Sequence, residues 1–235
     1  MIRNSYPNRE EWLQARGAGI GASDAAAILE ISPWVSKVQL WEEKTGRRKP
    51  KDLSGVPAVQ RGIAEEPIIR KQFIHDHPEF LVDHHAFDIL SLKRKPFINA
   101  TLDGELLYMG PADKSRYLEP GMRGVLEIKT GSYSTQKYLD KWTGSVIPEF
   151  YFAQVCQQLL VTGWDFAWVQ AKLFRTDAKY ARGNDNSNLP ETYEKSFFIS
   201  RQDPAVLKSL PVIEDAHTEF WACVTENRMP WSTIR

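Results

Sequence analysis

An acid and a lysine two positions apart are the most chemically suggestive feature of the sequence. They are Glu127 and Lys129 in the stretch GVLEIKTG, whose apolar residues predict a β-strand. Strand alternation places both side chains on one face, with Leu126 and Ile128 on the other. Such a pair is common on a solvated strand, so its meaning depends on what lies beside it.

A second carboxylate lies upstream, in the stretch NATLDGEL. Asp103 precedes Gly104, which permits a tight turn, and a neighbouring strand could bring Asp103 beside Glu127. Two carboxylates and a strand carbonyl would form a hard oxygen site suited to Mg²⁺ or Mn²⁺. A lysine at its edge could orient a metal-bound water, or help to deprotonate it, for attack on phosphorus. The residues are therefore compatible with metal-dependent attack of water on phosphorus.

The glycine-rich stretch RGAGIGASDAAAIL, residues 16–29, has the composition of an anion site. Ser23 is predicted to cap a helix whose free N–H groups point toward the glycines, and Arg16 adds donors that match phosphate oxygens. No G-K-[ST] ending follows, and the preceding REEWLQA is predicted as a helix capped by Asn8, so a P-loop and a dinucleotide fingerprint are both excluded. A plain glycine turn between two helices remains an equally good interpretation.

Composition bounds the class of protein. The 235 residues are 42% hydrophobic and 26% charged, which is typical of a globular chain, and we expect one domain over residues 1–235. The 30 Lys and Arg residues balance 30 Asp and Glu residues, so a polyanion would have to be held by a local basic surface. No apolar run of about 18 residues could cross a membrane, and the N-terminus lacks the apolar core of a signal peptide. Cys156 and Cys223 are expected to be free thiols, so the sequence predicts a cytoplasmic protein.

Hydrophobic periodicity predicts helices first, then strands, then an alternation of both. Helices are predicted near residues 8–16, 23–30, 36–45, 57–76, 134–142, 148–162 and 203–227. Strands are predicted at residues 80–90, 98–109 with a tight turn near Gly104, 124–130, 166–174 and 193–200. The polar segment 175–192 is expected to be a mobile loop. This pattern predicts a mixed α/β fold.

Six blocks, in order, resemble one nuclease family. An Asp followed by Glu-x-Lys on a strand is the core motif of the PD-(D/E)xK nucleases, and the surroundings resemble their lambda-exonuclease-like (YqaJ) viral recombinase branch. The blocks are EEWLQARGAGIGASDAAAIL, LWEEKTG, RGIAEEPIIRKQF, NATLDGEL, GVLEIKT and YFAQVCQQLLVTG. Leu102 stands where the motif has a proline. This departure affects only the expected geometry of the local turn. The resemblance implies a restriction-endonuclease-like core, with a central mixed β-sheet flanked by helices.

The same resemblance assigns roles to residues of the predicted metal site. Asp103 and Glu127 would bind the metals, with the Ile128 backbone carbonyl as a further ligand. Lys129 would position or activate the water. Glu66 matches a helix carboxylate that approaches the second metal or its waters.

Further residues gain roles from the resemblance alone. Gln154 matches a family glutamine that faces the active site, although the residues themselves make Gln154, Gln157 and Gln158 equally plausible surface positions. Arg16 and Ser23 match residues that contact the 5′-terminal phosphate of duplex DNA.

Four further groups of residues are interpreted from the sequence: one proline, two lysines, four histidines and six tryptophans. Pro67 should kink its helix. Lys137 and Lys141, one helical turn apart, are candidates for DNA backbone contacts or a solvated face. The histidines at 75, 77, 84 and 85 are not predicted to bind metal, because no third well-spaced ligand accompanies them. Six tryptophans are expected in the core or in subunit contacts: Trp12, Trp34, Trp41, Trp142, Trp164 and Trp168.

The function that the resemblance implies is a metal-dependent 5′→3′ exonuclease acting on linear double-stranded DNA. It would use two Mg²⁺ ions, for which Mn²⁺ can substitute, and act as a ring-shaped homotrimer in a bacterial or phage-infected cytoplasm. Its 3′ single-stranded tail would pass to a separate single-strand-annealing recombinase. Two alternatives stay open: a structure-selective or restriction-like endonuclease, and a non-catalytic DNA-end-binding recombination protein.

Overall fold

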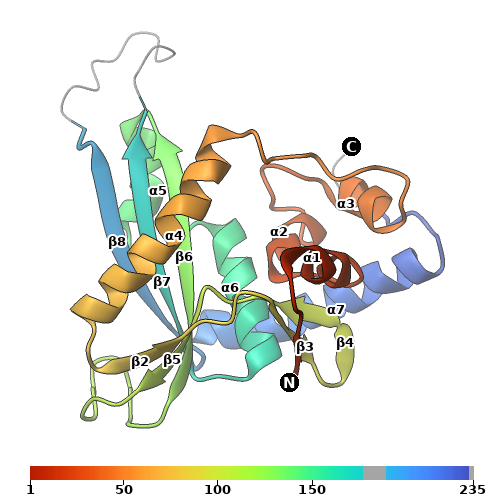
Figure 1. The fold of residues 1–235 in the computed structure, drawn as a ribbon. Helices are drawn as coiled ribbons and strands as arrows, with labels where there is room; N and C mark the ends of the chain where they lie inside the picture. The colour runs from red at the N-terminus through yellow and green to blue at the C-terminus, as the bar shows by residue number, and fades with distance from the viewer. Residues whose placement is uncertain (177–188, 233–235) are drawn as a thin grey trace.

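Two β-sheets and the helices packed on them build the structure shown in Figure 1, a computed structural model that describes residues 1–176 and 189–232. The strands are β1 (Ile2–Ser5), β2 (Phe80–Asp83), β3 (Asp88–Leu92), β4 (Lys95–Ala100), β5 (Gly104–Tyr108), β6 (Arg123–Tyr133), β7 (Phe166–Arg175) and β8 (Thr192–Ser200). The helices are α1 (Arg9–Gly17), α2 (Ala25–Ile28), α3 (Lys37–Lys44), α4 (Pro57–Asp76), α5 (Gln136–Thr143), α6 (Glu149–Thr162) and α7 (Pro204–Thr225), with a short 3-10 helix η1 (Ala22–Asp24) before α2.

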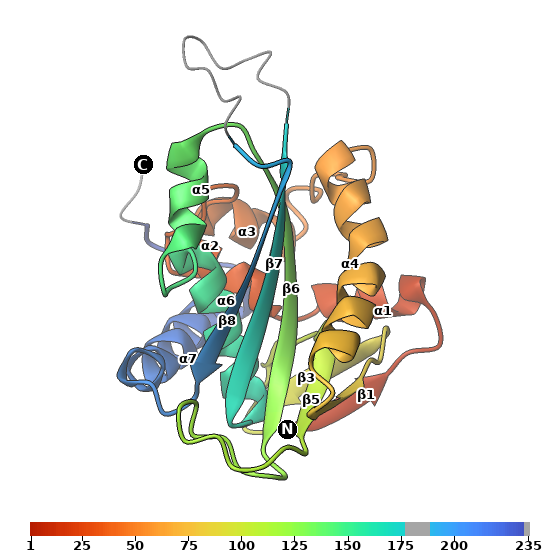
Figure 2. The same ribbon diagram turned by 90° about the vertical axis from the view of Figure 1, so that its left-hand side faces the viewer.

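The larger sheet has the strand order β2-β5-β6-β7-β8. This sheet is mixed, because β6 and β7 run parallel while every other pair of adjacent strands in it is antiparallel. A smaller antiparallel sheet has the order β1-β3-β4. Helix α4 lies on one face of the larger sheet, and α5 and α6 lie on the other (Figure 2). The predicted mixed α/β fold, with a central mixed sheet flanked by helices, is therefore confirmed.

Strand β6 divides its side chains between the two faces of the sheet. Leu126 and Ile128 pack in the apolar cluster on the α4 side, and Val125 packs in the cluster on the α6 side. Both Glu127 and Lys129 make hydrogen bonds with α6. Strand alternation therefore sets the face on which the candidate chemistry lies.

Two predicted strands are each divided in the structure. Residues 80–90 become β2 and β3, which enter different sheets, and residues 98–109 become β4 and β5. The tight turn predicted near Gly104 is wrong, because Gly104 already pairs with Leu126 as the first residue of β5. The break falls at residues 101–103, where the chain crosses from the small sheet to the large one.

The remaining elements lie close to the predicted ones. Helix α1 begins after Asn8, whose side chain accepts the Glu11 N–H at 3.0 Å as an N-cap. Strand β1 has no counterpart in the prediction, because IRNS is too short and polar to give a strand signal.

Of the predicted loop 175–192, residues 177–188 lie outside the described part of the chain. No helix within residues 1–176 and 189–232 combines the length and apolarity of a membrane span.

Helix α7 packs on α6 and brings a histidine into the interior. His217 is 0% exposed, and its Nε2 lies 2.7 Å from Gln157 Oε1 of α6. Burial lowers the pKa of His217 to about 4, although the nearby Asp24 carboxylate acts in the opposite direction. The ring is therefore neutral in the folded protein at pH 7.

We expect His217 to make the folded state less stable as the pH falls from about 6.5 toward 4. Its pKa is lower in the folded chain than in the unfolded chain, so the unfolded state binds more protons within this window. The loss amounts to about 3 kcal/mol at most, at roughly 1.4 kcal/mol for each pKa unit. Urea unfolding at both ends of the window should show a larger loss for the wild type than for His217→Gln, which does not titrate. Equal losses would show that His217 does not carry this effect.

Candidate active site

The candidate active site lies where β5 begins beside β6. Strand pairing places Asp103, the residue before β5, opposite Glu127, and Asp103 Oδ2 accepts the Ile128 N–H at 2.7 Å. Glu127 is 3% exposed. Burial, together with the charges of Glu127 and Glu66, holds the pKa of Asp103 well above its usual range. A cation would relieve this repulsion between the crowded carboxylates.

Lys129 and Gln154 both hold the Glu127 carboxylate. Lys129 Nζ lies 2.6 Å from Glu127 Oε1, and Gln154 Nε2 donates to the same oxygen at 2.7 Å. Lys129 Nζ also donates to Gln154 Oε1 at 2.9 Å. Burial lowers the pKa of Lys129, but the Glu127 and Asp103 carboxylates outweigh it, so the pKa lies above its usual value. In this arrangement the lysine is an ammonium, which can orient a water molecule or a phosphate oxygen as a donor.

Helix α4 brings a further carboxylate, Glu66, to the wall of the same cleft. A cleft of about 610 Å³ is lined by the candidate metal-site residues Glu66, Asp103, Glu127, Ile128 and Lys129. Arg70, one turn further along α4, donates to Glu66 Oε1 at 2.6 Å. The helix continues through Pro67, whose ring nitrogen cannot donate to the Ile63 carbonyl. The sequence thus singled out residues that the fold does bring together.

The structure distinguishes the glutamines of α6, which the sequence did not. Gln157 and Gln158 are 0% exposed, so a surface position is wrong for both, and Gln154 is half-buried. Gln158 Nε2 donates to Glu127 Oε2, so α6 holds both oxygens of this carboxylate. The spacing of Gln154 and Gln158, four residues apart on an otherwise apolar helix, is the signal that could have found them.

Trp34 stands at the mouth of the cleft rather than in the core. It is 64% exposed, packs edge-on against Phe150 with ring centroids 4.9 Å apart, and lines the cleft together with Tyr151. The Tyr151 ring in turn lies 4.6 Å from Lys129 Nζ. Of the two positions expected for Trp34, the core is therefore wrong, and a subunit contact stays a prediction. Buried tryptophans, as predicted, are Trp41, Trp142, Trp164 and Trp168.

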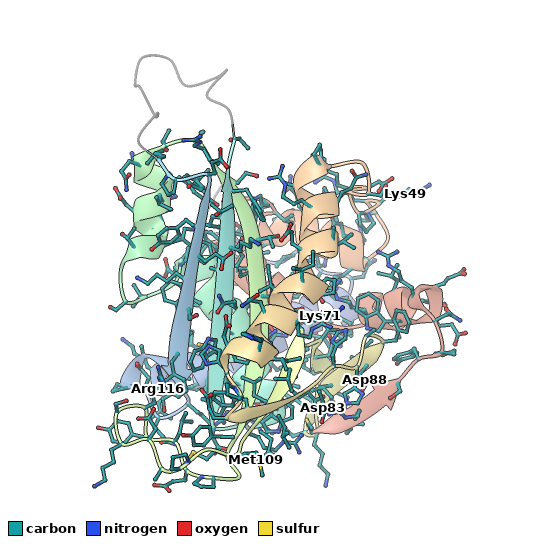
Figure 3. The ribbon with its side chains drawn as sticks, turned by 60° about the vertical axis from the view of Figure 1, so that its left-hand side comes forward. Lys49, Lys71, Asp83, Asp88, Met109 and Arg116 are labelled. Carbon is teal, nitrogen blue, oxygen red and sulfur yellow. The ribbon has the colours of Figure 1, made fainter. Side chains whose placement is uncertain are left out.

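His84 is a further residue of this neighbourhood that the sequence did not assign. It directly follows Asp83, the last residue of β2, which Figure 3 labels. Burial and the nearby Arg70 lower the pKa of His84, while Glu66 and the Asp103 backbone act in the opposite direction. His84 thus lies beside two of the candidate metal-site residues.

The glycine-rich loop brings Arg16 and Ser23 together. Arg16 Nη2 donates to Ser23 Oγ at 2.8 Å, and Ser23 is exposed. Ser23 is not the helix cap that the sequence predicted, because it lies inside η1 and Gly21 takes the cap position. The Gly21 N–H donates to Asp24 Oδ2 at 3.0 Å. The following α2 has only 4 residues, so a helix dipole adds little here and the donors are the Arg16 and Ser23 side chains.

Lys44, in the LWEEKTG block on α3, holds the glycine-rich loop in place. Lys44 Nζ donates to the Gly19 carbonyl at 2.6 Å and lies 2.9 Å from Asp24 Oδ2. On the other side the Ile20 N–H donates to the Phe97 carbonyl of β4 at 2.6 Å. The loop is therefore held between a helix and a strand.

Lys137 and Lys141 are exposed on α5, and neither lines the cleft. Lys141 Nζ lies 5.7 Å from the Tyr138 ring. Their contact with DNA therefore stays a prediction.

The mixed sheet, the aspartate beside a Glu-x-Lys strand and the facing helices define the PD-(D/E)xK class of nuclease folds. The chain belongs to the family of the YqaJ-like viral recombinase domain, whose family model matches residues 11–165. This range includes the cleft residues and the glycine-rich loop.

Relatives and solved structures agree with this membership. YqaJ of Bacillus subtilis (strain 168) is 32% identical over 166 residues, which are 71% of this chain and 46% of the relative, so the chain spans about half the length of that protein. The alkaline exonuclease LHK-Exo of Laribacter hongkongensis matches with a TM-score of 0.58 and 18% identity, over 93% of this chain and 96% of that one. A phage related exonuclease of Haemophilus somnus 129PT matches with a TM-score of 0.52 and 11% identity, over 89% of this chain and 96% of that one. The two structural matches establish a shared fold.

We expect Gly19→Ala to destabilise the protein, because a Cβ at Gly19 would lie 2.8 Å from the Phe97 carbonyl oxygen and 2.4 Å from Asn99 Nδ2. Overpacking of this kind costs about 1 to 3 kcal/mol. Gly17→Ala is the matched control, because a Cβ at Gly17 would meet nothing within 4 Å. Thermal unfolding of the two variants and the wild type measures the difference. Equal stability of the two variants would contradict the close packing of the loop against β4.

Proposed function

We propose that the chain is a metal-dependent 5′→3′ exonuclease that digests one strand of linear double-stranded DNA and leaves a 3′ single-stranded tail. The observation that carries the proposal is the meeting of Asp103, Glu127 and Lys129 in one cleft. The names of the structural neighbours support it: both are exonucleases, and LHK-Exo has also been crystallised with dAMP. Residues 1–235 would act as one domain.

The cleft suits a divalent cation. In the described residues no three His, Cys, Asp or Glu side chains are gathered into a ready metal site, so an ion would take Asp103, Glu127, the Ile128 carbonyl and water. These are hard oxygen donors, which favour Mg²⁺ with Mn²⁺ as a substitute. Glu66 would approach a second ion or its waters. The bound metal would lower the pKa of a water molecule and offset charge on the leaving oxygen.

The side chains of the cleft would bind and orient the reacting groups. Lys129 Nζ, held by Gln154 Oε1, would donate to the attacking water or to a phosphate oxygen. Gln154 would also hold the Glu127 carboxylate in place through its Nε2 donor. The exposed ring of Trp34 offers a flat surface on which a base can stack.

Arg16 and Ser23 would bind the 5′-terminal phosphate. The guanidinium has a planar set of donors that matches phosphate oxygens, and the Ser23 hydroxyl lies 2.8 Å from it. Recognition of this group would select DNA ends and would set the 5′→3′ direction.

The remaining parts of the proposal concern assembly and partners. A ring-shaped homotrimer would gather positive charge around a duplex although one chain has a net charge of zero. Exposed Lys137 and Lys141 would contact the DNA backbone, and a separate annealing recombinase would receive the single-stranded product. The place of action would be the cytoplasm.

Glu127→Gln and Lys129→Ala should each lower nucleotide release from end-labelled linear duplex by roughly 100-fold or more, since they remove metal ligation and water positioning. Both should fold, because the apolar clusters on the two faces of β6 contain neither side chain and stay unchanged. Glu194→Gln on β8, outside the cleft, is the matched control and should retain wild-type activity. Near-normal turnover by either cleft variant would exclude this site. Digestion of covalently closed circular duplex by the wild type would indicate an endonuclease instead.

Arg16→Ala should selectively slow digestion of duplexes that carry a 5′ phosphate. A charge-assisted contact of this kind contributes roughly 1.5 to 3 kcal/mol, or about tenfold to a hundredfold in rate. The wild type should prefer 5′-phosphorylated over 5′-hydroxyl ends, and the variant should lose most of that preference while slow cleavage continues. Initial rates on the two substrates measure the ratio. An unchanged ratio would mean that the glycine-rich loop is only a turn.

A further inference from the structure

A fully buried polar chain connects α7 with the glycine-rich loop. Gln157 and His217 are both 0% exposed. Gln157 Nε2 donates to the Ile20 carbonyl at 2.9 Å and to the Asn99 carbonyl at 2.8 Å. The amide nitrogen of Gln157 is thus used as a donor. Its Oε1 accepts the His217 Nε2–H at 2.7 Å. The histidine therefore fixes which way the amide of Gln157 points.

The two carbonyls that Gln157 holds lie at the centre of the loop's attachment. Ile20 lies between Arg16 and Ser23 in the sequence and forms a bridge with Ile98 of β4. The Asn99 N–H also donates to the Ile20 carbonyl at 2.9 Å. Movement at Ile20 would therefore change how Arg16 and Ser23 face each other.

Helix α6 also holds the candidate metal site. Gln154, one turn before Gln157, and Gln158, the next residue, both donate to the Glu127 carboxylate. One helix thus makes hydrogen bonds to the catalytic carboxylate and to the loop that carries Arg16. Because helices are rigid over one turn, the spacing between the two sites depends on how α6 is attached to each of them.

We propose that Gln157, oriented by His217, is a positioning residue that sets the 5′-phosphate pocket at its working distance from the catalytic carboxylates. The inference rests on the proposed function, because it needs a phosphate pocket at Arg16 and Ser23. Gln157 is fully buried and does not line the cleft. Its loss should weaken discrimination between DNA ends and leave the hydrolytic step intact.

The test compares initial rates on linear duplexes with 5′-phosphate and 5′-hydroxyl ends. For Gln157→Met, which keeps the side-chain volume, the preference for 5′-phosphate should fall by about threefold to tenfold, while the rate on 5′-hydroxyl ends stays within about twofold. Cys156→Ala is the matched control, because Cys156 is equally buried on α6 and packs in the apolar core. Its preference should equal that of the wild type.

Substitutions at His217 separate positioning from simple stability. His217→Gln, which keeps a donor, should retain the preference, and His217→Leu should lose it in the same direction as Gln157→Met. Hydrogen exchange at the Ile20 and Asn99 amides should accelerate in the variants that lose the preference. If Gln157→Met does not fold, the double variant Gln157→Met/His217→Leu takes its place in the test. It removes both partners of the buried hydrogen bond, so that neither is left unpaired.

The outcomes distinguish this inference from the proposed function. If the wild type itself shows no preference for 5′-phosphate, the pocket does not exist and the inference is overturned with it. If the wild type prefers 5′-phosphate and folded Gln157→Met keeps the full preference, the inference alone is overturned.

Discussion

Repulsion between crowded carboxylates, one of them buried, is the constraint on which the rest of the structure depends. Asp103 and Glu127 face each other where β5 begins beside β6, with Glu66 close by. Burial, and then the repulsion between these carboxylates, raises the pKa of Asp103. A site that must attract a divalent cation cannot avoid this, because the charge that binds the ion also destabilises the site without it. The protein therefore has to hold acidic groups together by other contacts.

Those contacts come from one lysine and from neutral amides. Lys129 contributes a single positive charge beside Glu127. Gln154 and Gln158 donate to the two oxygens of Glu127, and the Ile128 N–H donates to Asp103. Amide donors fix a carboxylate without cancelling its charge, whereas further lysines would neutralise the site that the cation needs. This explains two of the three glutamines at the centre of α6, Gln154 and Gln158, whereas Gln157 holds the glycine-rich loop.

The sequence predicted the parts of the site that local rules control. Alternation along β6 placed Glu127 and Lys129 on one face, and the position of Asp103 before Gly104 suggested its meeting with them. The glutamines could not be ranked, because their burial depends on β6 and on the loop, which pack against α6 from distant parts of the chain. The cap at Gly21 was missed for a similar reason. Lys44 of α3 pairs with Asp24, and this tertiary contact helps to place Asp24 where it accepts the Gly21 N–H.

Basic residues near the acidic cleft would allow a polyanion such as DNA to approach it. Several cations are already paired, as Arg3 is with Asp88 and Lys172 is with Glu65, so they add little to the external field. The connection between α3 and α4 is richer in exposed basic residues, of which Arg48 lies 3.7 Å from Glu42: Arg47, Arg48, Lys49 and Lys51. Figure 3 shows Lys49 projecting from this connection, whose later residues Leu53 and Val56 line the cleft. A DNA backbone near the cleft would therefore meet positive charge at its rim, while the carboxylates stay on its floor. Because screening limits charge effects to about 8 Å at physiological salt, this placement matters more than the net charge of zero.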